Sequence, residues 1–191
     1  MFRPQYWTHG NLKLPDKEVD QVIAELKRVG KELIVRDENI SSYHFKRHSR
    51  PDKIWANTYG EVVEDITKSL GIYSECQYVY EYWSQLYFPN KYHSPHHHLS
   101  SPTDENYTAY ICFVHFIKPG KDKNFKFVDG EGKDYTPEQN EGDILCFPPF
   151  MWHRVAPVLE ERFAVAGNIS ITQMNALHHT EIQTFGINKH P

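Results

Sequence analysis

The hydrophobic positions in the first third of the chain follow the spacing of two amphipathic helices. After Pro15-Asp16, apolar side chains recur every three or four residues until Gly30, so an aspartate cap and a glycine stop frame a helix over residues 15–30. The same spacing over residues 61–70 predicts a second helix. Between the two, residues 37–57 are polar and irregular, with a turn predicted at Arg50-Pro51-Asp52. The apolar positions are Val19, Val22, Ile23, Leu26 and Val29 in the first stretch, and Val62, Val63, Ile66 and Leu70 in the second.

From Cys76 onward the pattern changes to short aromatic and β-branched segments separated by proline and glycine turns. This pattern is typical of an antiparallel sandwich or barrel. The predicted strands are Cys76–Phe88, Tyr107–Ile117, Phe125–Val128, Ile144–Phe147, Val155–Val158 and Arg162–Thr172. We therefore expect one mainly β domain over residues 1–191. It would comprise a helical flank (1–75), a β-barrel core (76–172) and a C-terminal extension (173–191).

Composition excludes several classes of protein. The 191 residues include 21 Lys+Arg and 25 Asp+Glu, for a formal charge of −4, which argues against nucleic-acid binding despite a basic run over residues 44–50. The three cysteines lie in no CxxC pair, which argues against a disulfide scaffold or a zinc ribbon. No segment approaches the roughly 20 apolar residues that span a membrane, and the N-terminus lacks a signal-peptide core. The expected location is cytoplasmic, without membrane contact.

Histidines are the more informative residue type, because four of the twelve lie in the segment His93–His98 directly after a predicted strand. A lone histidine would be assigned to a surface loop, but a cluster between two strands favours metal binding. In an extended chain alternate side chains share a face, so His96 and His98 can point to one centre while His97 points away. Such a site needs a third ligand from elsewhere.

The segment Gly142–His153 is the best source of that ligand. Gly-Asp opens a strand, two prolines end it, and His153 follows in what we expect to be a constrained turn.

Arg162, nine residues after His153, begins an alternating strand on which it shares a face with Ala164, Ala166 and Asn168. The two alanines leave room for a ligand, and a guanidinium binds a carboxylate through two parallel hydrogen bonds. The alternative is a surface ion pair between Arg162 and the neighbouring Glu160 or Glu161.

These residues resemble, in order, the motifs of the iron(II)/2-oxoglutarate-dependent oxygenases. The resemblance spans roughly half the chain and is greatest to small oxygenases whose first motif is His-x-His-Pro-x-Ser, matched here by residues 96–101. The second motif, Gly-Asp-x-x-x-Phe-Pro…His…Arg, is matched by Gly142-Asp143, Phe147-Pro148, His153 and Arg162. The resemblance implies a double-stranded β-helix (a jelly-roll or cupin-like barrel) with Fe(II) and 2-oxoglutarate bound at its mouth.

The metal ligands implied by the resemblance are His96, His98 and His153. Most relatives carry His-x-Asp/Glu as the first pair, which gives two histidines and one carboxylate. Because His98 occupies the carboxylate position here, Asp104 stays open as an alternative ligand, with Glu105 beside it.

The co-substrate contacts implied are Arg162, which would hold the distal carboxylate of 2-oxoglutarate, together with Tyr110 and Asn168. The implied activity is hydroxylation of a small-molecule or peptide substrate by O2, with formation of succinate and CO2. Two alternatives stay open: a cupin-type metalloenzyme that does not use 2-oxoglutarate, and a non-enzymatic barrel that binds metal or ligand. Only the first of the three functions needs Arg162 as an anchor. A homodimer also stays open.

Overall fold

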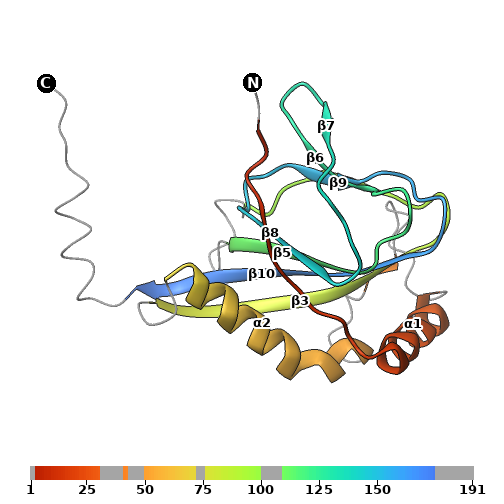
Figure 1. Cartoon of the computed structure of the whole chain (residues 1–191), viewed down its shortest axis with the longest axis horizontal. Coiled ribbons are helices and arrows are strands. Elements are labelled where there is room, and N and C mark those ends of the chain that lie inside the picture. The colour runs from red at the N-terminus through yellow and green to blue at the C-terminus, as the bar shows by residue number, and fades with distance from the viewer. Residues whose placement is uncertain (1–2, 31–40, 43–49, 72–75, 100–108, 175–191) are drawn as a thin grey trace, which may run out of the picture.

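The structure is a computed structural model that describes residues 3–30, 41–42, 50–71, 76–99 and 109–174. Two antiparallel sheets lie face to face, and two helices cover the outer face of the larger sheet (Figure 1). The prediction of a mainly β double-stranded β-helix with N-terminal flanking helices is confirmed. Within the described residues, no helix combines the length and the apolar character needed to cross a bilayer.

The larger sheet has the strand order β1-β8-β5-β10-β3-β2, and the smaller sheet has the order β4-β9-β6-β7. The strands of the larger sheet are β1 (Trp7–Asn11), β2 (Ser41–Ser42), β3 (Cys76–Tyr87), β5 (Ala109–Lys118), β8 (Asp143–Phe147) and β10 (Arg162–Met174). The strands of the smaller sheet are β4 (His93–His96), β6 (Phe125–Val128), β7 (Asp134–Tyr135) and β9 (His153–Val155). The helices are α1 (Asp16–Gly30), the 3₁₀ helix η1 (Pro51–Trp55) and α2 (Ala56–Ser69).

Both predicted helices are present, and α2 begins five residues before the predicted start at Glu61. The extra turn buries Tyr59, which extends the stripe of Val63 and Ile66 toward the N-terminus. The polar residues around Tyr59 hide this continuation in the sequence. Both helices pack their apolar stripes on the larger sheet, as expected of amphipathic surface helices.

The predicted strands are present, but the segment predicted as Val155–Val158 is displaced. Strand β9 covers His153–Val155, so His153 lies in a strand and not in a turn. Pro157 explains the early end, because proline has no N–H group to donate to a strand partner.

Four short strands escaped the sequence analysis: β1, β2, β4 and β7. Each has five residues or fewer, and none carries the apolar alternation that marks a half-buried strand. Residues 37–40 and 43–49 of the predicted irregular segment lie outside the described residues. The turn predicted at Arg50-Pro51-Asp52 is instead the start of η1.

The long central strand β10 pairs with β3 on one side and β5 on the other, and its alternation separates two apolar layers. Phe163, Val165 and Ile169 belong to the cluster beneath the helices. Ala164 and Ala166 belong to the cluster between the two sheets. The face predicted for Arg162 therefore points into the barrel.

Gly167, on the same strand, is required by a close approach. A Cβ atom at this position would lie 2.3 Å from Cζ of Phe113 and 2.7 Å from the carbonyl oxygen of Glu81. Any larger residue would push β10 away from β3, and with it the neighbouring side chain of Asn168.

An ion pair between the buried Asp52 and the partly exposed Arg50 fixes η1 to the larger sheet. The Asp52 carboxylate is fully buried and accepts hydrogen bonds from the backbone N–H and the hydroxyl of Ser84, at 3.0 and 2.9 Å. Nε of Arg50 donates to the same carboxylate at 3.1 Å, and the guanidinium lies over the Tyr82 ring. Asp52 thus neutralises Arg50 and satisfies a backbone donor in the middle of β3.

Replacing Asp52 with alanine should lower the free energy of unfolding by about 3 kcal/mol. Removal of the carboxylate leaves the buried N–H and hydroxyl groups of Ser84 without their acceptor, and the partly buried Arg50 loses its counter-charge. Denaturant unfolding of the two proteins measures the loss. D122A, which replaces an exposed aspartate, serves as the control. An equal loss of unfolding free energy in both variants would contradict a special role for Asp52.

Candidate metal centre

Strand pairing brings the predicted histidines together. In the β4–β9 ladder His96 lies directly opposite His153. Two residues beyond His96, the backbone N–H of His98 donates to the carbonyl of Pro149 at 2.9 Å, which ties the end of β4 to the turn before His153. One ring nitrogen from each of His96, His98 and His153 lies within 4.8 Å of the other two. The three predicted ligands therefore lie close enough together that they could hold one metal ion.

The hydrogen bonds of these rings determine which nitrogen carries the proton. Nδ1 of His96 lies 2.8 Å from the carbonyl oxygen of Ser94, and Nδ1 of His153 lies 2.9 Å from that of Met151. A carbonyl only accepts, so both Nδ1 atoms must donate, and the lone pair of each neutral ring is on Nε2. Nδ1 of His98 bonds Oδ1 of Asn168 at 2.6 Å. Fixing one ring nitrogen through an acceptor is the usual support for a metal-binding histidine.

Burial keeps the imidazoles of His96 and His153 neutral. It lowers the pKa of His96 to about 4, against a smaller opposing contribution from the hydrogen bond to Ser94. Burial holds the pKa of His153, only 4% exposed, well below its usual range, and the neighbouring histidines lower it further. Neutral imidazole is the form that binds metal, so His96 and His153 can accept a cation without first losing a proton. Three imidazoles suit Fe, Zn, Cu or Ni.

This electrostatic setting predicts an unusual pH dependence of metal binding. Three histidines with ordinary pKa values near 6.5 would all be protonated at pH 5–6, and affinity would fall about a thousandfold per pH unit. Because the pKa of His96 is about 4 and that of His153 is also lowered, protons compete at no more than one ligand in this range. We expect the Co(II) dissociation constant to rise by at most about tenfold between pH 6 and pH 5. A slope of three protons in a titration series would contradict the assignment.

The two remaining histidines of the cluster have other surroundings. The ring of His97 packs edge-on against that of Trp152, with 4.6 Å between the ring centroids. His97 is not one of the three grouped histidines, as the alternation predicted. His93 stacks on His96 with 4.0 Å between ring centroids, and burial lowers its pKa to about 3.

Arg162 is the most unusual residue of the barrel interior. Its side chain is 1% exposed, and Nε, Nη1 and Nη2 have no hydrogen-bond partner among the described residues. Its guanidinium carbon lies 5.2 Å from the centre of the Tyr87 ring and 5.6 Å from that of Phe116. Burial lowers the pKa of Arg162, and Tyr87 acts in the opposite direction. Aromatic rings offset only part of the cost of burying a charge, so the guanidinium keeps the capacity to bind an anion.

The alternative ion pairs for Arg162 are not formed. Glu161 instead pairs with Lys27 at 2.7 Å, and Glu160 accepts the backbone N–H of Lys121 at 2.8 Å. The neighbours of Arg162 on its own face of β10 are the alanines, as the alternation predicted.

The other predicted contacts have different outcomes. Asn168 bonds His98 and, through Nδ2, Oε1 of Glu81 at 3.0 Å. Tyr110 is 47% exposed on β5, and its role stays a prediction. Asp104 and Glu105 lie outside the described residues.

Glu81 is the site residue that the sequence analysis missed. The signal was present in the alternation of β3, where Glu81 and Gln85 share a face with Trp83 and Tyr87. The aromatic character of the strand obscured it.

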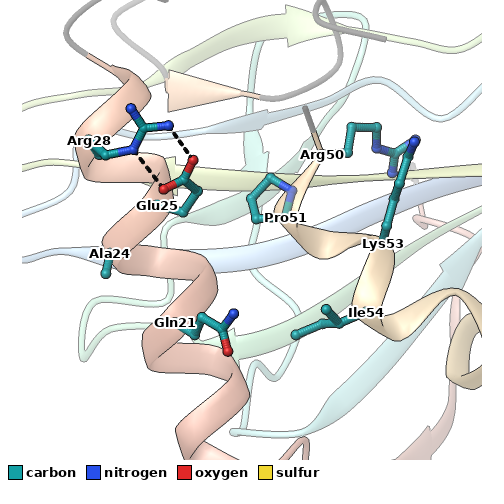
Figure 2. Close-up of a pocket in the computed structure, with 8 residues that line it drawn as sticks. All are labelled: Gln21, Ala24, Glu25, Arg28, Arg50, Pro51, Lys53 and Ile54. Atoms are coloured by element: carbon teal, nitrogen blue, oxygen red, sulfur yellow. Dashed lines mark hydrogen bonds and ion pairs between the residues drawn. The ribbon is translucent and has the colours of Figure 1, made fainter. Parts of the chain in front are cut away.

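A concavity lies between α1 and η1 (Figure 2). Arg28 and Glu25 pair within it, with 2.8 Å between Nε and Oε2, and Pro51 and Ile54 line it from η1. It lies in the helical layer and includes none of the three grouped histidines, so it is separate from the candidate metal centre.

Comparison with known proteins adds information on the fold. No family model and no curated protein matches the sequence. A prolyl-4-hydroxylase from Pseudomonas putida superposes with a TM-score of 0.61 and 16% identity, covering 88% of this chain and 92% of that chain. A Trichoplax adhaerens prolyl hydroxylase, in complex with a hypoxia inducible factor peptide fragment, superposes with a TM-score of 0.57 at 12% identity. The match covers 86% of this chain and 83% of that chain.

A viral collagen prolyl hydroxylase from Paramecium Bursaria Chlorella virus-1, in its 2OG complex, gives a TM-score of 0.51 at 16% identity over 88% and 96% of the two chains. With identities this low, similarity in structure is evidence about the fold. The chain therefore has the double-stranded β-helix fold that these prolyl hydroxylases share.

Proposed function

We propose that the protein is an Fe(II)- and 2-oxoglutarate-dependent oxygenase whose metal is held by His96, His98 and His153. The observation that carries the proposal is the buried guanidinium of Arg162, which has no hydrogen-bond partner in the part of the chain that the structure describes. It shares a face of β10 with Asn168, which bonds His98. A buried cation in the same barrel as three grouped histidines fits a ligand that chelates metal at one end and carries a carboxylate at the other. 2-Oxoglutarate is such a ligand.

The protein residues supply binding, orientation and a dry environment. The Nε2 atoms of His96, His98 and His153 would hold the metal and would leave room beside it for the keto acid and O2. Arg162 would bind the distal carboxylate through two parallel hydrogen bonds, strengthened by its burial. When bound, the iron and the keto acid together supply the oxidation of a substrate C–H bond by O2, with succinate and CO2 as products.

Two further site assignments belong to the proposal. Tyr110 is a candidate hydrogen-bond donor to the co-substrate, and Asp104 is the alternative to His98 as a metal ligand. Ala164 and Ala166 support the co-substrate assignment, because their small side chains separate Arg162 from the histidine end of the same face.

A peptide is the first substrate class to test, ahead of small molecules. The fold similarity includes three prolyl hydroxylases, one of them bound to a peptide. A homodimer stays a prediction.

A cupin-type metalloenzyme is the second candidate. It is favoured by the composition of the grouped ligands, which are three histidines without a carboxylate among the described residues. A carboxylate would neutralise one of the two charges of Fe(II), whereas a third imidazole neutralises none.

The deciding experiment measures 2-oxoglutarate binding to the Fe(II)-loaded protein without oxygen, by calorimetry and by visible charge-transfer absorption. The oxygenase requires both signals, and succinate formation once O2 is admitted. Metal binding without 2-oxoglutarate binding would favour the cupin-type enzyme. Failure to bind metal would overturn both.

A further inference from the structure

The ladder between β3 and β10 places an acidic residue beside the candidate metal centre. In this pairing Asn168 lies directly opposite Glu81. The Asn168 amide spans the distance between the two strands and the histidine loop: Nδ2 donates to Oε1 of Glu81 at 3.0 Å, and Oδ1 lies 2.6 Å from Nδ1 of His98. The three residues form a continuous series of hydrogen bonds that ends at a candidate metal ligand.

The orientation of this series is determined at its acidic end. A carboxylate accepts hydrogen bonds and has none to donate, so the Asn168 amide must turn its NH2 group toward Glu81. Its carbonyl oxygen then faces His98, and an oxygen acceptor there requires the proton of the neutral imidazole to be on Nδ1. The lone pair of the ring is consequently on Nε2. Glu81 therefore selects the tautomer of His98 through the intervening amide of Asn168.

His98 differs in this respect from the other two histidines. The tautomers of His96 and His153 are set by backbone carbonyls of their own segments, which are acceptors whatever the side chains nearby. At His98 the acceptor is a side-chain amide that can rotate by 180° and present a donor instead. Without an acidic partner for Asn168, nothing in the series would prevent that rotation.

We propose that Glu81 is a positioning residue for the metal centre, which fixes the metal-binding tautomer of His98 through Asn168. The inference rests on the proposed function, and it adds a residue that touches neither metal nor co-substrate. Glu81 also gives the site a negative charge that the three imidazole ligands lack. Since its side chain is exposed, solvent weakens the direct field of that charge, and the hydrogen bonds are the main route of its influence.

The test reverses the hydrogen-bonding character of residue 81. In E81K the ammonium group only donates, so Asn168 is forced to turn its carbonyl toward it and its NH2 toward His98. In E81Q both amide orientations are allowed. We expect the Co(II) dissociation constant of the full chain to rise about 10- to 100-fold in E81K, the range for lost support of a metal ligand, and by less in E81Q. The nitrogen NMR shifts of His98 in the metal-free protein should show the proton moving from Nδ1 to Nε2 in E81K.

A double-mutant cycle separates positioning from a simple change of charge. In an N168A background the series is interrupted, and we expect E81K to change the Co(II) affinity by less than about twofold. An equal loss with and without Asn168, or an unchanged His98 tautomer, would overturn the proposal. E61K, which carries the same substitution at an exposed position of α2, controls for net charge and should bind Co(II) like the wild type. If the wild type binds no Co(II), the proposed function fails as well; if only E81K is without effect, the proposed function stands.

Discussion

Replacing Arg162 with methionine should abolish 2-oxoglutarate binding and at the same time stabilise the ligand-free protein. Arg162 would contribute two charge-assisted hydrogen bonds to the co-substrate, each worth about 1.5–3 kcal/mol. Their loss predicts an increase of at least about a hundredfold in the dissociation constant of 2-oxoglutarate. Isothermal titration of the Fe(II)-loaded protein without oxygen measures it.

The gain in stability follows from the same observation. The guanidinium is 1% exposed and unpartnered among the described residues, so the ligand-free protein bears the cost of burying a charge. Substitution of buried ionic groups by apolar residues of similar volume is often neutral or stabilising by about 1–4 kcal/mol. Methionine is long enough to fill the space beside Tyr87 and Phe116. The thermal midpoint of apo R162M should therefore equal or exceed that of the wild type.

R154M provides a matched control for R162M. Arg154 makes a bidentate ion pair with Asp134 at 2.6 and 3.0 Å, but it is partly exposed and lies away from the barrel interior. Its replacement should leave 2-oxoglutarate binding intact. Unchanged 2-oxoglutarate affinity in R162M would exclude Arg162 as the anchor and favour the cupin-type enzyme. A large loss of stability would show instead that Arg162 supports the fold.

Replacing His153 with alanine should weaken metal binding by at least about a hundredfold. Even residues that only support a ligand cost 10- to 100-fold in affinity when they are replaced, and His153 would be a ligand itself. Its ring is 4% exposed and packs against Phe147 at 4.8 Å, so circular dichroism must show that H153A is folded. Co(II) titration followed by visible absorption gives the affinity. H96A, at a less buried ring, repeats the test if H153A does not fold.

H97A is the natural control, because His97 is adjacent in sequence to two of the grouped histidines but packs on Trp152. It should bind Co(II) like the wild type. The pair H98A and D104A distinguishes the two possible third ligands. We expect a loss in H98A and none in D104A. The reverse result would assign the ligand to Asp104.

The sequence predicted the fold class from local patterns, and it failed where those patterns are short. Six β-branched and aromatic segments and two amphipathic stretches gave the main strands and helices, because each spans enough residues for its period to be visible. Strand β4 contains His93–His96 without apolar alternation, and its pairing with β9 stabilises it instead. The sequence predicts Asp52 in a polar turn, whereas the structure buries it. Its partners are Arg50, two residues away, and Ser84 on β3, which only the folded chain brings to it.

For the candidate site, the sequence by itself determined which side chains share a face: His96 with His98, and Arg162 with the two alanines. These relations depend only on the twofold period of extended backbone, which is a local property. The tertiary structure alone decided which faces meet. The β4–β9 register put His96 opposite His153, and the β3–β10 register put Glu81 opposite Asn168. Closure of the barrel buried Arg162, whose guanidinium has no hydrogen-bond partner within the described ranges. Strand register depends on which buried faces pack together across the barrel, and the pattern of one segment does not show which other segment it will pair with.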